Sequence, residues 1–144
     1  MSKRILVVCV GNLCRSPTAE VILRNTLPSD GFAVKSAGLS AVYGNPMDPR
    51  AAALLAERGL SGEKHVSHRI NKPLVEGADI VLAMEKKHLS ALKKLAPAAR
   101  GKIHLLGKWQ GDLEIPDPYG RDLSAYLRAY QMIEESIKRW CPRI

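Results

Sequence analysis

The sequence predicts an α/β fold in a single domain, with a four-stranded parallel sheet and helices on both faces. Two observations lead to this prediction. Apolar runs of strand length alternate along the chain with stretches of helical periodicity, as in sheets whose parallel strands are joined by helices. The chain has 144 residues, which is enough for one compact domain but too few for two ordinary ones. We therefore expect one domain over residues 1–144.

The predicted strands are short apolar runs of the kind that parallel sheets bury. They cover residues 5–9, 32–36, 80–84 and 103–106. The predicted helices run from Pro17, with Ser16 as a possible N-cap, to the residue before Pro28, and over 50–58, 86–96 and 123–140. Their expected inward faces contain Ala19, Ile22, Leu23 and Thr26; Ala51, Leu54 and Leu55; Leu89, Leu92 and Leu95; and Tyr126, Tyr130, Ile133, Ile137 and Trp140.

Ligands of such sheets bind beyond the carboxyl ends of the strands. Three segments should meet at that edge: Cys9, the pair Met84 and Glu85, and the loop after Leu106. We therefore expect the functional site there.

Composition narrows the class of protein. An apolar fraction of 46% and a charged fraction of 25% are typical of soluble globular proteins. The apolar run at 5–10 is too short for a signal peptide or a bilayer span, so we expect a cytoplasmic protein without membrane insertion. The net charge of +8 fits solvated helix faces or an anionic partner. No basic run carries interleaved aromatic residues, so we expect no nucleic-acid binding, whereas a phosphorylated or acidic protein fits.

The three cysteines suggest neither a disulfide framework nor a zinc site. Cys9, Cys14 and Cys141 form an odd count, and cytosolic thiols stay reduced. Cys9 and Cys14 lack the usual spacing of zinc ligands. We expect no metal and no cofactor.

The segment 9–16 has the form Cys, five residues, Arg, Ser, and it joins a strand to a helix. Such a loop can curl so that successive backbone N–H groups point inward and bind a tetrahedral oxyanion. Gly11 permits the tight turn and Asn12 tolerates unusual dihedral angles. Arg15 can hold two phosphate oxygens with its planar fork. The segment therefore predicts a phosphate-binding loop after the first strand.

Cys9 should lie at the bottom of this cradle. The helix dipole, the inward N–H groups and Arg15 all favour its thiolate, and Ser16 can donate a hydrogen bond to it. The plainer alternative is a buried cysteine ending a strand and an Arg solvated on the next helix. The residues expected to line the phosphate site are Val10, Gly11, Asn12, Leu13, Cys14 and Ser16. Without a Gly-Lys-Ser/Thr sequence this is not a Walker loop, and a single Gly does not make a dinucleotide fingerprint.

A cysteine that attacks phosphorus needs a proton donor for the leaving oxygen. Asp117 is the best candidate, because Pro116 and Pro118 stiffen its loop. The alternative for this residue is an ordinary Asp-Pro turn. Asp112 and Glu114 are rival donors on the same loop.

These motifs together resemble the low-molecular-weight protein-tyrosine phosphatases. The resemblance runs from residue 5 to 140 and is carried by Cys-Val-Gly-Asn-Leu-Cys-Arg-Ser-Pro at position 9, Asp-Pro-Tyr at 117, Ser36-Ala37-Gly38, Asp48-Pro49-Arg50-Ala51 and His65. Met84-Glu85-Lys86 and residues 115–119 are most similar to the bacterial branch that acts on tyrosine autokinases of exopolysaccharide or capsule export.

The resemblance implies catalysis through a cysteinyl-phosphate, with Cys9 as nucleophile, Arg15 as clamp and Asp117 as general acid and then base. It implies that Asn12, Ser16 and His65 hold the loop in shape, and that Leu13, Tyr43 and Tyr119 surround the phenyl ring. The expected partner is a phosphotyrosine protein, a tyrosine autokinase, and the protein itself should be a monomer or weak oligomer. His68 departs from the family, which often has Arg there.

Two alternative functions remain open at this point. A thiol-dependent arsenate reductase would need two further cysteines around residues 80–92, which contain none. A non-catalytic phosphate-binding module would need neither Cys9 nor Asp117. We also expect Cys14, five residues after Cys9, to protect that thiol from over-oxidation, the alternative being a small buried filler.

Overall fold

The computed structural model describes residues 2–144 and contains one parallel sheet with strand order β2-β1-β3-β4. Its strands are β1 (Lys3–Cys9), β2 (Phe32–Gly38), β3 (Ile80–Ala83) and β4 (Ile103–Leu105). The four predicted strands are thereby confirmed, with boundary differences of one or two residues. Among residues 2–144, no helix combines the length and apolar composition needed to cross a bilayer.

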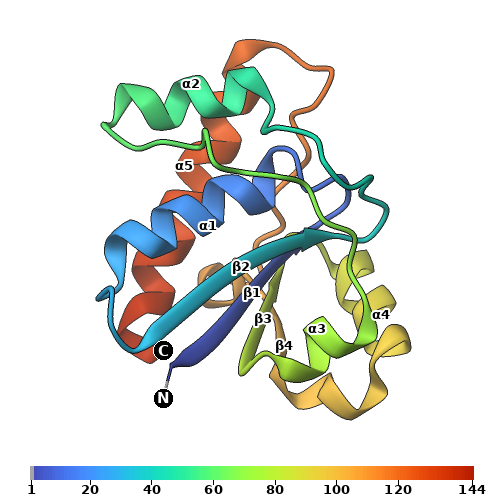
Figure 1. Cartoon of the computed structure of the whole chain (residues 1–144). Coiled ribbons are helices and arrows are strands. Elements are labelled where there is room, and N and C mark those ends of the chain that lie inside the picture. The colour runs from blue at the N-terminus through green and yellow to red at the C-terminus, as the bar shows by residue number, and fades with distance from the viewer. Residues whose placement is uncertain (1) are drawn as a thin grey trace.

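Helices cover both faces of the sheet, as predicted (Figure 1). One face carries α1 (Arg15–Thr26), α2 (Pro49–Glu57) and α5 (Leu123–Trp140). The other carries α3 (Lys72–Gly77) and α4 (Lys86–Leu95). Short 3-10 turns complete the chain at Pro97–Lys102, Lys108–Gln110 and Cys141–Arg143.

The strand β1 runs through the middle of the core and supplies both faces. Alternate side chains of a strand point to opposite sides. Ile5 and Val7 therefore pack with α1 and α5, whereas Leu6 and Val8 pack with α3 and α4. The predicted apolar stripe of α5 is confirmed in full, because all five of its members are buried.

Three details of the helices differ from the prediction. Thr26 is exposed at the end of α1, since Leu27 just beyond the helix takes the buried position. Leu95 is 37% exposed, because α4 turns His88 and Leu92 inward and leaves Leu95 at the flank. The six-residue helix α3 was not predicted; it begins after Asn71, whose side chain caps it, and is too short to show helical periodicity.

The position of β1 determines where the site forms. Its neighbours are β2 on one side and β3 on the other, so the chain connections diverge from it. Such a switch point leaves a crevice beyond the carboxyl end of the strand. Cys9 is the last residue of β1 and stands at this crevice.

Candidate active site

Asn12 holds the loop between β1 and α1 in shape. It has the left-handed φ of 57° that Asn tolerates, and it is fully buried. Its side-chain amide donates to Ser16 Oγ at 2.8 Å and to Ser36 Oγ at 2.9 Å, and its Oδ1 accepts from the backbone of His68 at 2.9 Å. Its carbonyl oxygen lies 2.6 Å from His65 Nε2. The loop is therefore tied to β2 and to the segment 65–68.

Cys9 faces a helix start that no side chain covers. Its sulfur lies 2.9 Å from Ser16 Oγ, and the residue is 3% exposed. The N-cap of α1 is Cys14 and makes no side-chain hydrogen bond, so the first N–H groups of α1 are free for an anion. The sequence suggested Ser16 as the N-cap, and this prediction is wrong. Ser16 lies inside the helix, where its hydroxyl contacts Cys9 and Asn12.

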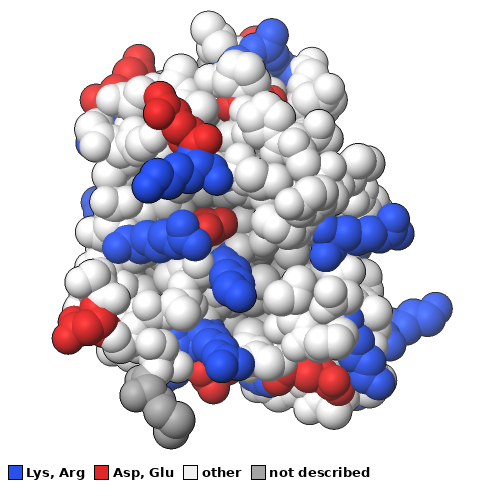
Figure 2. Space-filling view, in the orientation of Figure 1, with Lys and Arg blue, Asp and Glu red and all other residues white. Residues whose placement is uncertain are grey.

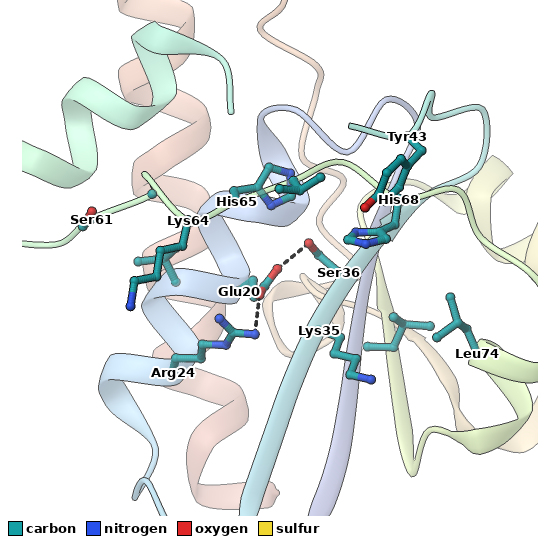
Figure 3. A pocket seen from close by; sticks show the side chains of 14 residues that line it. Glu20, Arg24, Lys35, Ser36, Tyr43, Ser61, Lys64, His65, His68 and Leu74 are labelled. Carbon is teal, nitrogen blue, oxygen red and sulfur yellow. Dashed lines mark hydrogen bonds and ion pairs between the residues drawn. The ribbon is translucent and has the colours of Figure 1, made fainter. Parts of the chain in front are cut away.

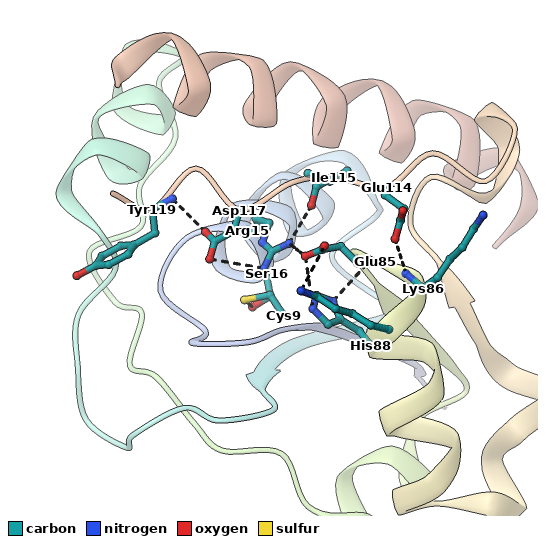
Figure 4. Close-up of polar contacts among 11 residues, drawn as sticks. Cys9, Arg15, Ser16, Glu85, Lys86, His88, Glu114, Ile115, Asp117 and Tyr119 are labelled. Carbon is teal, nitrogen blue, oxygen red and sulfur yellow. Dashed lines mark hydrogen bonds and ion pairs between the residues drawn. The ribbon is translucent and has the colours of Figure 1, made fainter. Parts of the chain in front are cut away.

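Arg15 is fixed in the wall of the site by contacts from two other elements (Figure 4). Its side chain is 2% exposed. Its Nη1 donates to Glu85 Oε2 at 2.6 Å and to the carbonyl oxygen of Ile115 at 2.8 Å. The predicted meeting of Cys9, Glu85 and the loop after Leu106 at one edge of the sheet is confirmed by these bonds.

Asp117 approaches the same guanidinium from the solvent side. Its Oδ2 lies 3.8 Å from Arg15 Nη2, and its side chain is 48% exposed. Its Oδ1 accepts from the backbone N–H of Tyr119 at 3.1 Å, which orients the carboxylate. The rival Glu114 is engaged elsewhere, with the backbone N–H of Lys86 at 2.8 Å, and Asp112 lies in a left-handed turn at φ 58°.

Glu85 and His88 form the support behind Arg15. Burial pushes the pKa of Glu85 up, but the hydrogen bond and charge of Arg15 outweigh it and hold this pKa below its usual range. Burial and then Arg15 lower the pKa of His88, which favours the neutral ring. His88 Nδ1 accepts from the backbone N–H of Glu85 at 3.2 Å, so the ring proton belongs on Nε2, 3.5 Å from Glu85 Oε2.

The expected rim residues lie at different places around the crevice. Tyr43 is 71% exposed and Tyr119 is 68% exposed, while Leu13 is half-buried. The ring of His68 packs edge-on against Tyr43 with centroids 5.1 Å apart. His68 therefore supports the loop with its backbone and Tyr43 with its side chain.

The side chain of Cys14 is buried beside α1. It lines a small hollow with Thr18, Ala51 and Tyr126, between α1, α2 and α5. Burial, followed by the charges of Asp48 and Cys9, raises the pKa of its thiol. The side chain of Asn12 is committed to the scaffold, so at the phosphate site Asn12 can offer only its backbone.

Two supporting residues received no role from the sequence. Glu85 was expected near the site but not as the partner of Arg15, and Ser36 links Asn12 to Glu20 through its hydroxyl. The local sequence carries no signal for either role, because the partners are up to 70 residues apart. Among residues 2–144, no group of three or more His, Cys, Asp or Glu side chains is arranged to hold a metal ion.

Known proteins are similar to this chain over nearly its whole length. The family model described as low molecular weight phosphotyrosine protein phosphatase matches residues 4–144. The phosphatase Wzb of Salmonella typhimurium is 45% identical over 97% of this chain and 93% of its own length. The structure of Vibrio vulnificus Wzb in complex with benzylphosphonate has a TM-score of 0.94, with 40% identity and full coverage of both chains.

A further solved relative carries a different specificity in its name. The YwlE arginine phosphatase from Geobacillus stearothermophilus has a TM-score of 0.91 and 36% identity, covering 98% of this chain and 92% of its own. The fold is thus common to relatives named for two substrates. From the match over residues 4–144, the chain belongs to the low molecular weight phosphotyrosine protein phosphatase family.

Proposed function

We propose that the protein is a protein-tyrosine phosphatase that works without metal or cofactor, with Cys9 as nucleophile, Arg15 as phosphate clamp and Asp117 as general acid. One observation carries the proposal. A buried thiol lies at an uncapped helix N-terminus, and the adjacent guanidinium contacts a half-exposed carboxylate at 3.8 Å. A phosphate held by the loop would lie between nucleophile and acid.

The reaction takes two steps. The Cys9 thiolate attacks phosphorus, the bond from phosphorus to the phenolic oxygen breaks, and Asp117 gives its proton to that oxygen. Asp117 then takes a proton from water, whose oxygen attacks the cysteinyl-phosphate and releases inorganic phosphate and the thiolate. The loop N–H groups and Arg15 stabilise the equatorial oxygens in both steps.

The depth of the site favours phosphotyrosine over phosphoserine. Cys9 is 3% exposed, so a phosphate that reaches it must stand well below the surface. A phenyl ring spans that depth, whereas a seryl linker would leave the phosphate too far above the sulfur. The exposed rings of Tyr43 and Tyr119 can line the path of a phenyl group, and a relative of this chain was solved with benzylphosphonate.

The partner, on this proposal, is a bacterial tyrosine autokinase of polysaccharide export, dephosphorylated in the cytoplasm by a monomeric or weakly associating enzyme. The support is the resemblance to the exopolysaccharide branch together with Wzb among the relatives. Incubation of the protein with phosphorylated autokinases from the same cell, followed by phosphate release, tests the partner.

The activity itself is tested with purified protein and an aryl phosphate, with and without a metal chelator. We expect turnover that the chelator leaves unchanged. The variant Cys9→Ser should lose turnover but keep the phosphate site, since a serine hydroxyl is not ionised near neutral pH. Retained turnover in Cys9→Ser would remove Cys9 as the nucleophile.

A second candidate is phosphoarginine hydrolysis, favoured by the likeness to the YwlE arginine phosphatase. A direct comparison of kcat/KM on phosphotyrosine and phosphoarginine peptides separates the two. We expect phosphotyrosine to be preferred, because the exposed rim side chains include two tyrosine rings suited to an aromatic group. Preference for phosphoarginine would replace the proposed substrate and leave the roles of Cys9 and Arg15 in place.

A further inference from the structure

A separate hollow lies beside the sheet, apart from the catalytic residues. It has a volume of about 540 Å³ and is lined by α1, β2 and the segment 61–68 (Figure 3). Polar and aromatic side chains from these elements converge on it: Glu20, Arg24, Lys35, Tyr43, Lys64 and His68. Its size is that of a typical ligand-binding cavity.

The charge of this hollow is positive. Glu20 is the one carboxylate in its lining, and it is already paired with Arg24 Nη2 at 2.7 Å and hydrogen-bonded by Ser36. Lys35 and Lys64 are exposed, and neither is in an ion pair with a carboxylate in the described part of the chain. Figure 2 shows basic side chains running down this face of the molecule, over α1 and β2.

A neighbouring hollow continues this one, and the two together form a trough. It has a volume of about 300 Å³, shares Leu6, Lys35 and Leu74 with the first, and extends to Arg4. We call the two together the β2 trough. Lys35 stands where they join, so an occupant that followed the trough would pass this cation.

The trough begins at the rim of the catalytic site. Tyr43, expected beside the phenyl ring, also lines the trough, and so does His65, whose ring contacts the Asn12 carbonyl. In the sheet register Gly38 lies opposite Cys9, and Lys35 precedes Gly38 by three residues, roughly 10 Å along the strand. A polypeptide that leaves the catalytic site past Tyr43 can therefore enter the trough within a few residues.

The edge of the sheet at the trough is shielded by a side chain rather than by another strand. Within residues 2–144, the outer edge of β2 bridges to other backbone at Gly38 alone, which pairs with Arg69. Further along, the Val34 carbonyl accepts from the Arg24 guanidinium. An extended segment thus has room along β2 without displacing a strand.

We propose that the β2 trough is a docking surface for an extended acidic segment of the protein substrate, a few residues from its phosphotyrosine. The proposal rests on the proposed phosphatase function and names a feature of its substrate. Lys35 and Lys64 meet the carboxylates of the segment, and the apolar Val21, Val66 and Leu74 contact its backbone and aliphatic stems. Such contacts act on the encounter and affinity for protein substrates and leave the chemistry at Cys9 unchanged.

The test uses three phosphotyrosine peptides. Two carry about four glutamates starting about four residues before or after the phosphotyrosine, a distance an extended chain spans to Lys35. The third carries glutamines instead. The double variant Lys35→Glu with Lys64→Glu is compared with a matched control, Lys94→Glu with Lys138→Glu, two exposed lysines outside the trough. Both variants change the net charge equally, so their difference reports the position of the charge.

We expect the trough variant to lower kcat/KM about tenfold on at least one glutamate peptide, through KM, and the loss to shrink in high salt. Its activity on the glutamine peptide and on an aryl phosphate should stay within about twofold of wild type, as should the control variant on every substrate. Equal losses in both variants, or none in either, would overturn the docking surface. Failure of the wild type on all phosphotyrosine peptides would instead refute the proposed function.

Discussion

Gly38 lies where β2 meets the phosphate loop, and a single added methyl group there tests how tightly the loop must be held. A Cβ at this position would lie 2.4 Å from the Val10 carbonyl oxygen and 2.9 Å from both the Asn12 nitrogen and the Ala41 Cβ. Two of these three neighbours are backbone atoms of the loop. They cannot move aside as the end of a flexible side chain can, so Gly38→Ala must displace the loop itself.

The size of the effect follows from these distances. Ordinary contact begins at 3.4 Å, so the Val10 carbonyl would have to retreat by 1.0 Å to accommodate the methyl group. Overpacking of this kind costs about 1–3 kcal/mol of stability. A catalytic group misplaced by about 1 Å can lose about 10²-fold in rate. We therefore expect Gly38→Ala to fold with reduced stability and to lose about 10²-fold in kcat on an aryl phosphate.

The assay pairs urea unfolding with steady-state kinetics at a temperature where the variant is folded. The matched control is Gly101→Ala, where the added methyl group meets nothing within 4 Å. That variant should keep wild-type kcat. If Gly38→Ala loses stability but keeps kcat, the loop tolerates the displacement and its shape is less critical than we argue. Wild-type values for both would refute the contact itself.

Three further predictions concern named side chains. Asp117→Asn should lower kcat about 10²–10⁴-fold on phosphotyrosine, and less on esters whose leaving group needs no proton; equal losses on both would indicate a structural role instead. The pKa of Glu85 is held below its ordinary value of 4.5, so its contribution to stability is present above that pH and is lost as the pH falls through the lower folded value. Wild type and Glu85→Gln should therefore differ in free energy of unfolding at neutral pH and converge in strong acid; a constant difference at all pH values would contradict this. After a peroxide pulse, wild type should recover activity with dithiothreitol, because Cys14 condenses with the Cys9 sulfenic acid to a disulfide and water, whereas Cys14→Ser should recover poorly. Burial raises the pKa of the Cys14 thiol, so this protection should improve at higher pH, and equal recovery in both proteins would leave Cys14 a packing role.

Much of the fold could be predicted because its signals are local and periodic. The helix α5 was predicted with both ends correct, since its apolar stripe repeats with helical spacing from Tyr126 to Trp140. The strand β1 and the loop after it were recognisable from a continuous apolar run and the spacing of Cys9 and Arg15. The burial of Leu95 was predicted wrongly, because periodicity gives the spacing of a helical face but not its width against the neighbouring element.

The supporting residues of the site could not be predicted in the same way. The bond from Arg15 to Glu85 joins residues 70 positions apart, and that from Arg15 to Ile115 joins residues 100 positions apart. Both depend on how two strand ends and a loop converge. Ser16 shows the same limit locally, because a serine before a proline reads as an N-cap, while tertiary contacts with Cys9 and Asn12 decide its actual role.

The two carboxylates around Arg15 are held with unequal strength, and this inequality suits the proposed chemistry. Glu85 bonds to Nη1 at 2.6 Å from a side chain 20% exposed, whereas Asp117 lies 3.8 Å from Nη2 and is 48% exposed. An incoming phosphate can therefore take Nη2 from Asp117 while Glu85 and the Ile115 carbonyl keep the guanidinium in place. On the proposed mechanism, substrate binding thus releases Asp117 from its ion pair, so that its carboxyl group is available to the leaving phenolate.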